Sequence, residues 1–163
     1  YRLEFVQSDG LAYINIPITR WMVWNILSPN LPIKKRNLSS AIFFSSQINI
    51  IRASLWKNLL LLDDELSSLA QWKVNDMVDK GYVWHISPDG LDILEFSKKK
   101  GFIFSGAIGE NIASWNVSDP FLQKGLEDSG SHRMNMLRSE WKKIWIGYAI
   151  KNGQTYVVQI FGE

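Results

Sequence analysis

The feature that most constrains this fold is an Asn-Gly pair near the carboxyl end of the chain, Asn152-Gly153. It separates two runs of apolar and β-branched residues, at 144–151 and 154–161. Asn-Gly is the residue pair that two-residue β-hairpin turns favour most strongly, because both positions adopt positive φ angles. The pattern therefore predicts an antiparallel hairpin at this end of the chain.

Helical patterns precede the hairpin. The best defined begins after Asp63, which can cap a helix with acidic residues in its first turn, and it ends at Gly81. Its predicted apolar stripe consists of Leu66, Leu69, Ala70, Val74 and Met77. Further helices are predicted from Ser45 or Ser46 to about residue 56, from 88 to 100, and from Ser118-Asp119-Pro120 to about 128.

The first 44 residues differ in character from the rest. Segments 1–7 and 11–17 flank a short Ser-Asp-Gly turn, 21–27 is a further strand-like apolar run, and a proline-containing break and a basic run follow. We predict that residues 1–44 form a β-rich extension and linker, and that 45–163 form the main domain. The aromatic and aliphatic content of the extension predicts that it packs against this domain. Strands, then helices, then strands predict an α+β fold or a three-layer sandwich.

Composition excludes several classes of protein. The chain has no cysteine, which rules out disulfides, thiolate catalysis and cysteine-ligated zinc. A net charge of +2 gives no argument for a nucleic-acid partner. No apolar run approaches the roughly 18–20 residues that span a bilayer. Because the chain opens at Tyr1 and not at methionine, we expect a processed or trimmed form, with membrane attachment only through a lipid anchor absent from this sequence.

Three residues are candidates for chemistry. The two histidines, His85 and His132, and the acidic Glu110 all lie in segments rich in glycine, serine or asparagine. Two imidazoles and a carboxylate suit zinc binding or general acid–base work. They are far apart in the sequence and form no helical HExxH pair, so spacing alone favours structural roles over a shared site. No phosphate-binding loop or nucleophile elbow is present.

Several segments resemble, in order, the motifs of the CAP superfamily (cysteine-rich secretory protein, antigen 5 and pathogenesis-related-1). The segments are INIIR at 48–52, DEL at 64–66, HISPDG at 85–90, GENIA at 109–113, SGSHRMNML at 129–137, IGYA at 146–149 and YVVQIFG at 156–162. Together they cover residues 45–163, and the extension at 1–44 is not part of the family core.

The resemblance implies an α-β-α sandwich with a central antiparallel sheet and a cleft where two histidines and two acidic residues meet. His85, Glu110 and His132 match three of these four positions, and Glu127, with Asp128 next, is the nearest candidate for the fourth. We expect His85 and His132 to lie side by side, with Glu110 beside one of them. The two histidines are then candidate ligands for a divalent metal such as zinc.

The resemblance also implies an extracellular or surface location. We expect a non-enzymatic binding module with an extracellular protein or lipid as ligand, because the family reuses its fold without a shared reaction. A metal-dependent hydrolase and a lipid or sterol carrier are the alternatives. The use of isoleucine, lysine and asparagine is typical of an AT-rich bacterial genome, and suggests a spirochaete surface lipoprotein of this family, of the borrelial kind.

Overall fold

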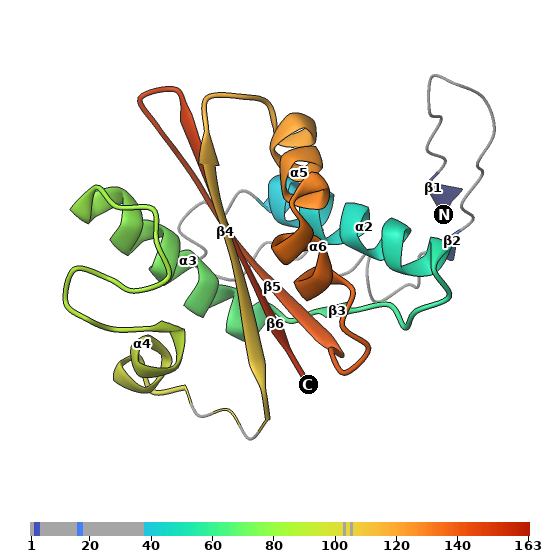
Figure 1. Cartoon of the computed structure of the whole chain (residues 1–163), viewed down its shortest axis with the longest axis horizontal. Helices are drawn as coiled ribbons and strands as arrows, with labels where there is room; N and C mark the ends of the chain where they lie inside the picture. The colour runs from blue at the N-terminus through green and yellow to red at the C-terminus, as the bar shows by residue number, and fades with distance from the viewer. Residues whose placement is uncertain (1, 4–15, 18–37, 103, 105) are drawn as a thin grey trace. The chain divides into compact units, whose positions relative to one another are not determined.

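The computed structural model in Figure 1 describes residues 2–3, 16–17, 38–102, 104 and 106–163. The chain divides into two compact units, Tyr1–Lys35 and Arg36–Glu163. In the first unit the described residues form an antiparallel pair of short strands, β1 (Arg2–Leu3) and β2 (Ile16–Pro17). The turn predicted at 8–10 and the strand predicted at 21–27 lie outside the described residues, as does most of the segment predicted to pack against the domain.

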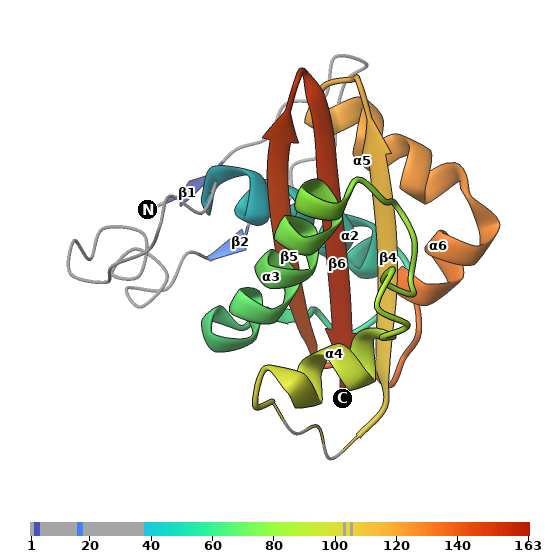
Figure 2. The same ribbon diagram turned by 90° about the vertical axis from the view of Figure 1, so that its left-hand side faces the viewer.

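A four-stranded sheet with helices on both faces forms the second unit (Figures 1 and 2). Its strand order is β3-β5-β6-β4, with α3 and α4 on one face and α2, α5 and α6 on the other. The helices are α2 (Leu38–Ser54), α3 (Asp64–Lys80), α4 (Ile93–Lys99), α5 (Asp119–Asp128) and α6 (Gly130–Met136). The strands are β3 (Leu61–Leu62), β4 (Ile108–Trp115), β5 (Lys143–Lys151) and β6 (Gln154–Gly162). The predicted α+β, three-layer α-β-α sandwich is confirmed.

The sheet is antiparallel over its three long strands. β5 and β6 form the predicted hairpin around Asn152 and Gly153, whose φ angles of 53° and 78° are the positive values that the turn requires. β4 pairs with β6 on the far side of the hairpin. The short strand β3 runs parallel to β5, so the sheet is mixed at that edge and not wholly antiparallel as predicted.

Strand alternation builds a separate core on each face of the sheet. On β6, Val157 and Phe161 pack toward α2 and α5, whereas Val158 and Ile160 pack toward α3. The stripe predicted on α3 supplies Leu69, Ala70, Val74 and Met77 to the second core. Among the described helices, none combines the length and the apolar character needed to cross a membrane.

Helix α2 begins earlier than predicted. It starts at Leu38 and not at Ser45, and Ala41 and Phe44, both assigned by the sequence to the extension, are buried in the core beside the sheet. The Ser45 hydroxyl donates a hydrogen bond to the Ile42 carbonyl inside the helix and therefore caps nothing. Burial of Ala41 and Phe44 against the sheet thus places them in a helix and not in the predicted extension.

Helix α4 is shorter than predicted, because its expected first turn forms a separate loop. Asp92 caps the helix, its side chain accepting from the Glu95 backbone while the Glu95 side chain accepts from the Asp92 backbone. Two elements were missed from the sequence. GENIA lies within the strand β4, and the segment from Gly130 to Met136 forms the helix α6.

The end of α2 carries an unusual residue. The backbone N–H groups of Trp56 and Lys57 donate to the carbonyls of Ala53 and Arg52, which is the hydrogen-bond pattern of a Schellman motif. Trp56 occupies its left-handed position with φ of 55°, where glycine is usual, and its side chain is 97% exposed. A non-glycine residue at this position costs about 1–2 kcal/mol of conformational energy.

Arg52 links α2 to α6, which lies on the same face of the sheet. Its guanidinium is fully buried and donates to the carbonyls of Asn58, Met136 and Arg138 at 2.7, 2.8 and 2.9 Å. Met136 is the last residue of α6, so a buried positive charge meets the negative end of that helix. Burial lowers the pKa of Arg52, which nevertheless stays charged at any physiological pH.

Candidate functional site

Strand β4 places two functional side chains on opposite faces of the sheet. Glu110 shares the face of Ile112, which packs in the core under α3, whereas Asn111 points to the α5 and α6 face. Register with β6 fixes both positions, since Glu110 lies opposite Ile160 and Asn111 opposite Gln159. One edge strand therefore contributes to both sides of the site.

The loop that carries His85 is held by a four-residue turn. In Ser87-Pro88-Asp89-Gly90 the Gly90 N–H donates to the Ser87 carbonyl at 2.8 Å, and Gly90 has a φ of 80°. Serine at the first position, proline at the second and glycine at the fourth suit such a turn. Ser87 is buried and bonds Leu91 through both its backbone and its hydroxyl, which closes the loop just after His85.

His85 and Glu110 form the central pair of the site. His85 Nδ1 lies 2.7 Å from Glu110 Oε2, and the imidazole is 48% exposed while the carboxylate is only 4% exposed. The second carboxylate oxygen, Oε1, is buried and has no hydrogen-bond partner among the described residues. The exposed imidazole is thus paired with a buried carboxylate, and the second oxygen of that carboxylate receives no hydrogen bond from the described residues.

A buried lysine lies beneath this pair. Lys73 on α3 is fully buried, and its ammonium donates to the His85 carbonyl at 2.8 Å. The ammonium also lies over the rings of Tyr82 and Phe96, at 5.1 and 5.9 Å from their centroids. Burial lowers the pKa of Lys73, while the charge of Glu110 opposes that shift. Lys73 therefore fixes the backbone of the His85 loop and sets a positive charge under the carboxylate.

His132 lies on α6, which a network of buried amides attaches to the sheet. The Asn111 side chain donates to the carbonyl of His132 and to Gln159 Oε1, each at 3.1 Å, and accepts from Asn135 at 3.0 Å. Gln159 in turn donates to Gln123 on α5 at 3.0 Å. Asn111 is 1% exposed, and this network fixes the position of α6 beside strand β4.

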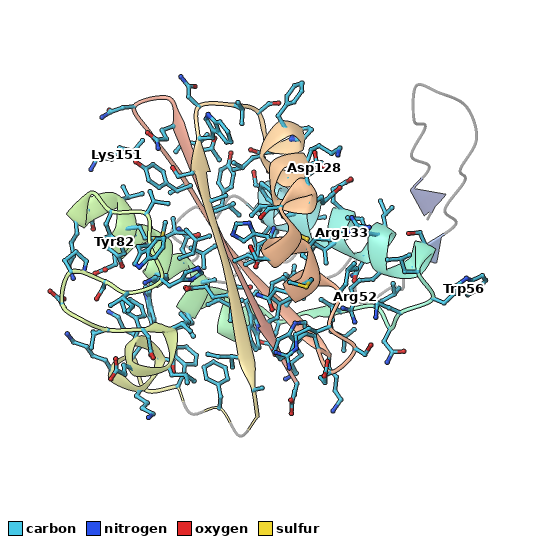
Figure 3. The ribbon with its side chains drawn as sticks, viewed as in Figure 1. Arg52, Trp56, Tyr82, Asp128, Arg133 and Lys151 are labelled. Atoms are coloured by element: carbon cyan, nitrogen blue, oxygen red, sulfur yellow. The ribbon has the colours of Figure 1, made fainter. Side chains whose placement is uncertain are left out.

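Neither candidate for the fourth member of the site forms a hydrogen bond or ion pair with a histidine among the described residues. Glu127 accepts a hydrogen bond from Gln123 at 2.9 Å, and Gln123 in turn accepts one from Gln159 in the amide network. Asp128 is exposed and pairs with Lys124, its neighbour one turn back on α5. Figure 3 shows Asp128 on α5 on the opposite side of β4 from Tyr82, which precedes the His85 loop. No contact of either carboxylate with His85 is seen in the described part of the chain.

Geometry shifts the pKa of the two histidines in opposite directions. The hydrogen bond to Glu110 raises the pKa of His85, although partial burial works against it. Burial, assisted by the charge of His85, lowers the pKa of His132. His132 Nδ1 is buried without a hydrogen-bond partner among the described residues.

We predict that His85 titrates above pH 6.5 and His132 below it. By linkage, the His85 pair stabilises the fold fully below the unfolded pKa, and this contribution is lost as the pH rises through the raised value. His132 acts in the opposite sense, since its protonation below pH 6.5 destabilises the fold. The ring signals of two histidines are simple to follow by NMR, and a His132→Gln variant assigns them. The reverse order of midpoints would contradict the geometry.

Two elements of the site had weak signals in the sequence. Lys73 falls within the apolar stripe of its helix, four residues after Leu69 and before Met77, and a lysine at a core position marks a buried charge. Gln159 likewise interrupts the apolar run of the last strand. Neither signal says which residues meet these side chains. Within the described residues, no three His, Cys, Asp or Glu side chains are grouped to enclose a metal ion.

These features define a class of protein. The model of the cysteine-rich secretory protein (CAP) family matches residues 46–161, a range that includes Glu110 and both histidines. The chain belongs to this family. It is 33% identical over 104 residues to the uncharacterized protein YkwD of Bacillus subtilis, an alignment that covers 64% of this chain and 40% of that protein. The chain thus spans less than half of the curated relative that it matches.

Solved structures share the fold. An extracellular protein of Bacillus anthracis containing an SCP domain superposes with a TM-score of 0.69 at 23% identity, covering 93% of this chain and 47% of that one. An outer surface protein of Borrelia burgdorferi superposes with a TM-score of 0.67 at 20% identity, covering 74% and 90%. The predicted membership of the CAP superfamily is confirmed, and an outer surface protein of Borrelia is among the structural neighbours.

Proposed function

We propose that this chain is an extracellular, non-enzymatic binding module that binds its ligand at the site of His85, Glu110 and His132. One observation carries the proposal. A buried carboxylate oxygen, Glu110 Oε1, and a buried imidazole nitrogen, His132 Nδ1, have no partner within the described residues. Unpaired buried polar atoms are costly, and a bound group or ordered water that reaches both would satisfy them.

The surroundings of His85 suit a ligand with both polar and apolar parts. Trp84 and Ile86, which flank the histidine, are 65% and 52% exposed, and the Trp84 ring lies 5.8 Å from the imidazole. Exposed aromatic and aliphatic side chains around a polar centre are typical of protein-binding sites. We infer an extracellular protein segment or a lipid as the ligand. The extracellular location rests on neighbours of the same fold that are described as extracellular or outer surface proteins.

A divalent metal is the simplest probe of this site. Glu110 Oε1 and the imidazole nitrogens are ligand types that zinc accepts, but the described side chains do not form a closed set of three ligands. Instead, His85 and Glu110 bond to each other. We therefore propose that zinc binds weakly, and that this arrangement favours a binding role over a metal-dependent hydrolase, whose ligands are held in place in advance.

Isothermal titration with zinc tests the proposal. The wild-type protein is expected to release heat on binding, and a His85→Ala/His132→Ala double variant is expected to lose at least tenfold in affinity, as removal of ligands or their supporting partners does. Binding should weaken as the pH falls, and the loss should begin above pH 6.5, because ligand imidazoles must be neutral and the raised pKa of His85 protonates that ring first. Arg133→Ala, which changes an exposed cation next to His132, is the matched control. Equal heats from the wild type and the double variant would show that the cluster is only structural.

A further inference from the structure

A second surface feature lies away from the histidine site. The loop between α2 and β3, together with the first residue of β3, exposes four apolar side chains within seven residues. They are Leu55, Trp56, Leu59 and Leu61, at 45%, 97%, 49% and 69% exposure. In Figure 3, Trp56 projects away from the ribbon, on the opposite side of the sheet from Tyr82 and the His85 loop. We call residues 55–61 the tryptophan loop.

The backbone of this loop does not favour a tryptophan. Trp56 occupies the left-handed position of a Schellman motif, which glycine fills at no steric cost. Its side chain makes no ring contact within the described residues and is almost fully exposed, so it contributes nothing to the packing of this unit. A strained position that holds a large, unpacked aromatic residue points to a role outside the fold.

The charges beside the tryptophan loop are predominantly positive. The segment 138–143 lies next to it, since the Lys57 ammonium bonds Ser139 at 3.1 Å and the Leu61 N–H donates to the Lys142 carbonyl. The neighbouring Arg138 and Lys143 are paired with Glu140 and Asp63. Lys57 and Lys142 have no carboxylate partner in the described part of the chain. The apolar tip therefore has two uncompensated cations at its margin.

We propose that the tryptophan loop docks on the surface of a bilayer that contains anionic phospholipid. A projecting tryptophan with leucines around it suits the boundary between headgroups and acyl chains, because fluid lipids can rearrange around an inserted side chain. Lysines at the margin keep their ammonium groups among anionic headgroups. A protein partner would instead need a patch complementary to a side chain that stands almost entirely clear of its neighbours. This surface association is independent of the histidine site.

Sedimentation with vesicles tests the proposal on the full chain. We expect the wild type to sediment with vesicles of phosphatidylcholine and phosphatidylglycerol, and far less with phosphatidylcholine alone. Trp56→Gly should lower partitioning roughly tenfold or more, because it removes the inserted aromatic ring. Glycine suits the backbone at this position, so the variant should unfold at the same temperature as the wild type or higher, which separates loss of binding from loss of fold. Trp115→Ala, at a tryptophan 65% exposed on β4, should leave partitioning unchanged.

Charge variants complete the experiment. Lys57→Gln and Lys142→Gln should each reduce partitioning by about fivefold at low salt, and the reduction should shrink as the salt concentration rises. Absence of wild-type sedimentation with anionic vesicles, or equal partitioning of Trp56→Gly, overturns the proposal. A dimer in light scattering that Trp56→Gly abolishes, without any vesicle binding, would also overturn it and assign the loop to contact between copies of the chain.

Discussion

Arg52→Met is expected to lower the free energy of unfolding by about 3–5 kcal/mol, as removal of one partner from a buried charged network does. Methionine matches the length of the arginine stem but donates no hydrogen bond. The carbonyls of Asn58, Met136 and Arg138 would then remain buried with no donor from this side chain. The Met136 and Arg138 carbonyls belong to the end of α6 and to the segment that follows it. We therefore expect the helix that carries His132 to loosen first.

Urea denaturation followed by circular dichroism measures this loss. Lys124→Met is a suitable control, because it removes an exposed cation that pairs with Asp128 on the same helix. Pairs of this kind contribute about 0.3–0.5 kcal/mol, so the control should stay within that range. A loss from Arg52→Met as small as that of the control would mean that the buried guanidinium costs as much to desolvate as its hydrogen bonds return.

Gly147→Ala is the second variant with a large expected effect. A Cβ atom at this position would lie 2.1 Å from the carbonyl oxygen of Ala70 and 2.9 Å from the Gln71 nitrogen, all backbone of α3. Backbone cannot rotate away, and the Gln71 side chain further fastens α3 to the strand by bonds to the Tyr148 carbonyl and N–H at 2.9 and 3.2 Å. We expect a loss of about 3 kcal/mol or more from overpacking.

Gly125 is a matched control, because its replacement by alanine is expected to raise the free energy of unfolding. A Cβ added at Gly125, inside α5, meets nothing within 4 Å. Gly125→Ala should therefore stabilise the protein by about 0.5–1 kcal/mol, through the higher helix propensity of alanine. Thermal unfolding of the two variants beside the wild type should move the midpoint down for Gly147→Ala and up for Gly125→Ala. A shift of both in the same direction would show that the close approach of α3 to the sheet does not govern stability.

The sequence predicted the elements whose signals are local. The hairpin at Asn152-Gly153 and the capped, striped helix α3 follow from turn chemistry and periodicity within the segments themselves. Strand β4 could not be predicted in this way. Its segment combines glycine, glutamate, asparagine and alanine, and it is a strand because eight of its residues pair with β6.

Helix α6 shows the same limit for a helical segment. Glycine, serine, histidine and asparagine are poor helix formers, and Arg52, Asn111 and Trp141 fix the helix by bonds to its carbonyls or side chains from other parts of the chain. The candidate site shows the same contrast between local sequence signals and contacts made by distant segments. The motifs named His85 and Glu110, but which side chains support them depends on contacts between distant segments.

The placement of Glu110 and Asn111 as neighbours on one edge strand has a consequence for how this chain tolerates insertions and deletions. A shift of β4 by one residue against β6 would turn the amide toward His85 and drive the carboxylate into the buried amides around Gln159. The His85–Glu110 pair and the anchorage of α6 would both be lost by the same shift of one residue. Length changes in the family should therefore accumulate in the loops before and after this strand, and within it variation should be confined to substitution.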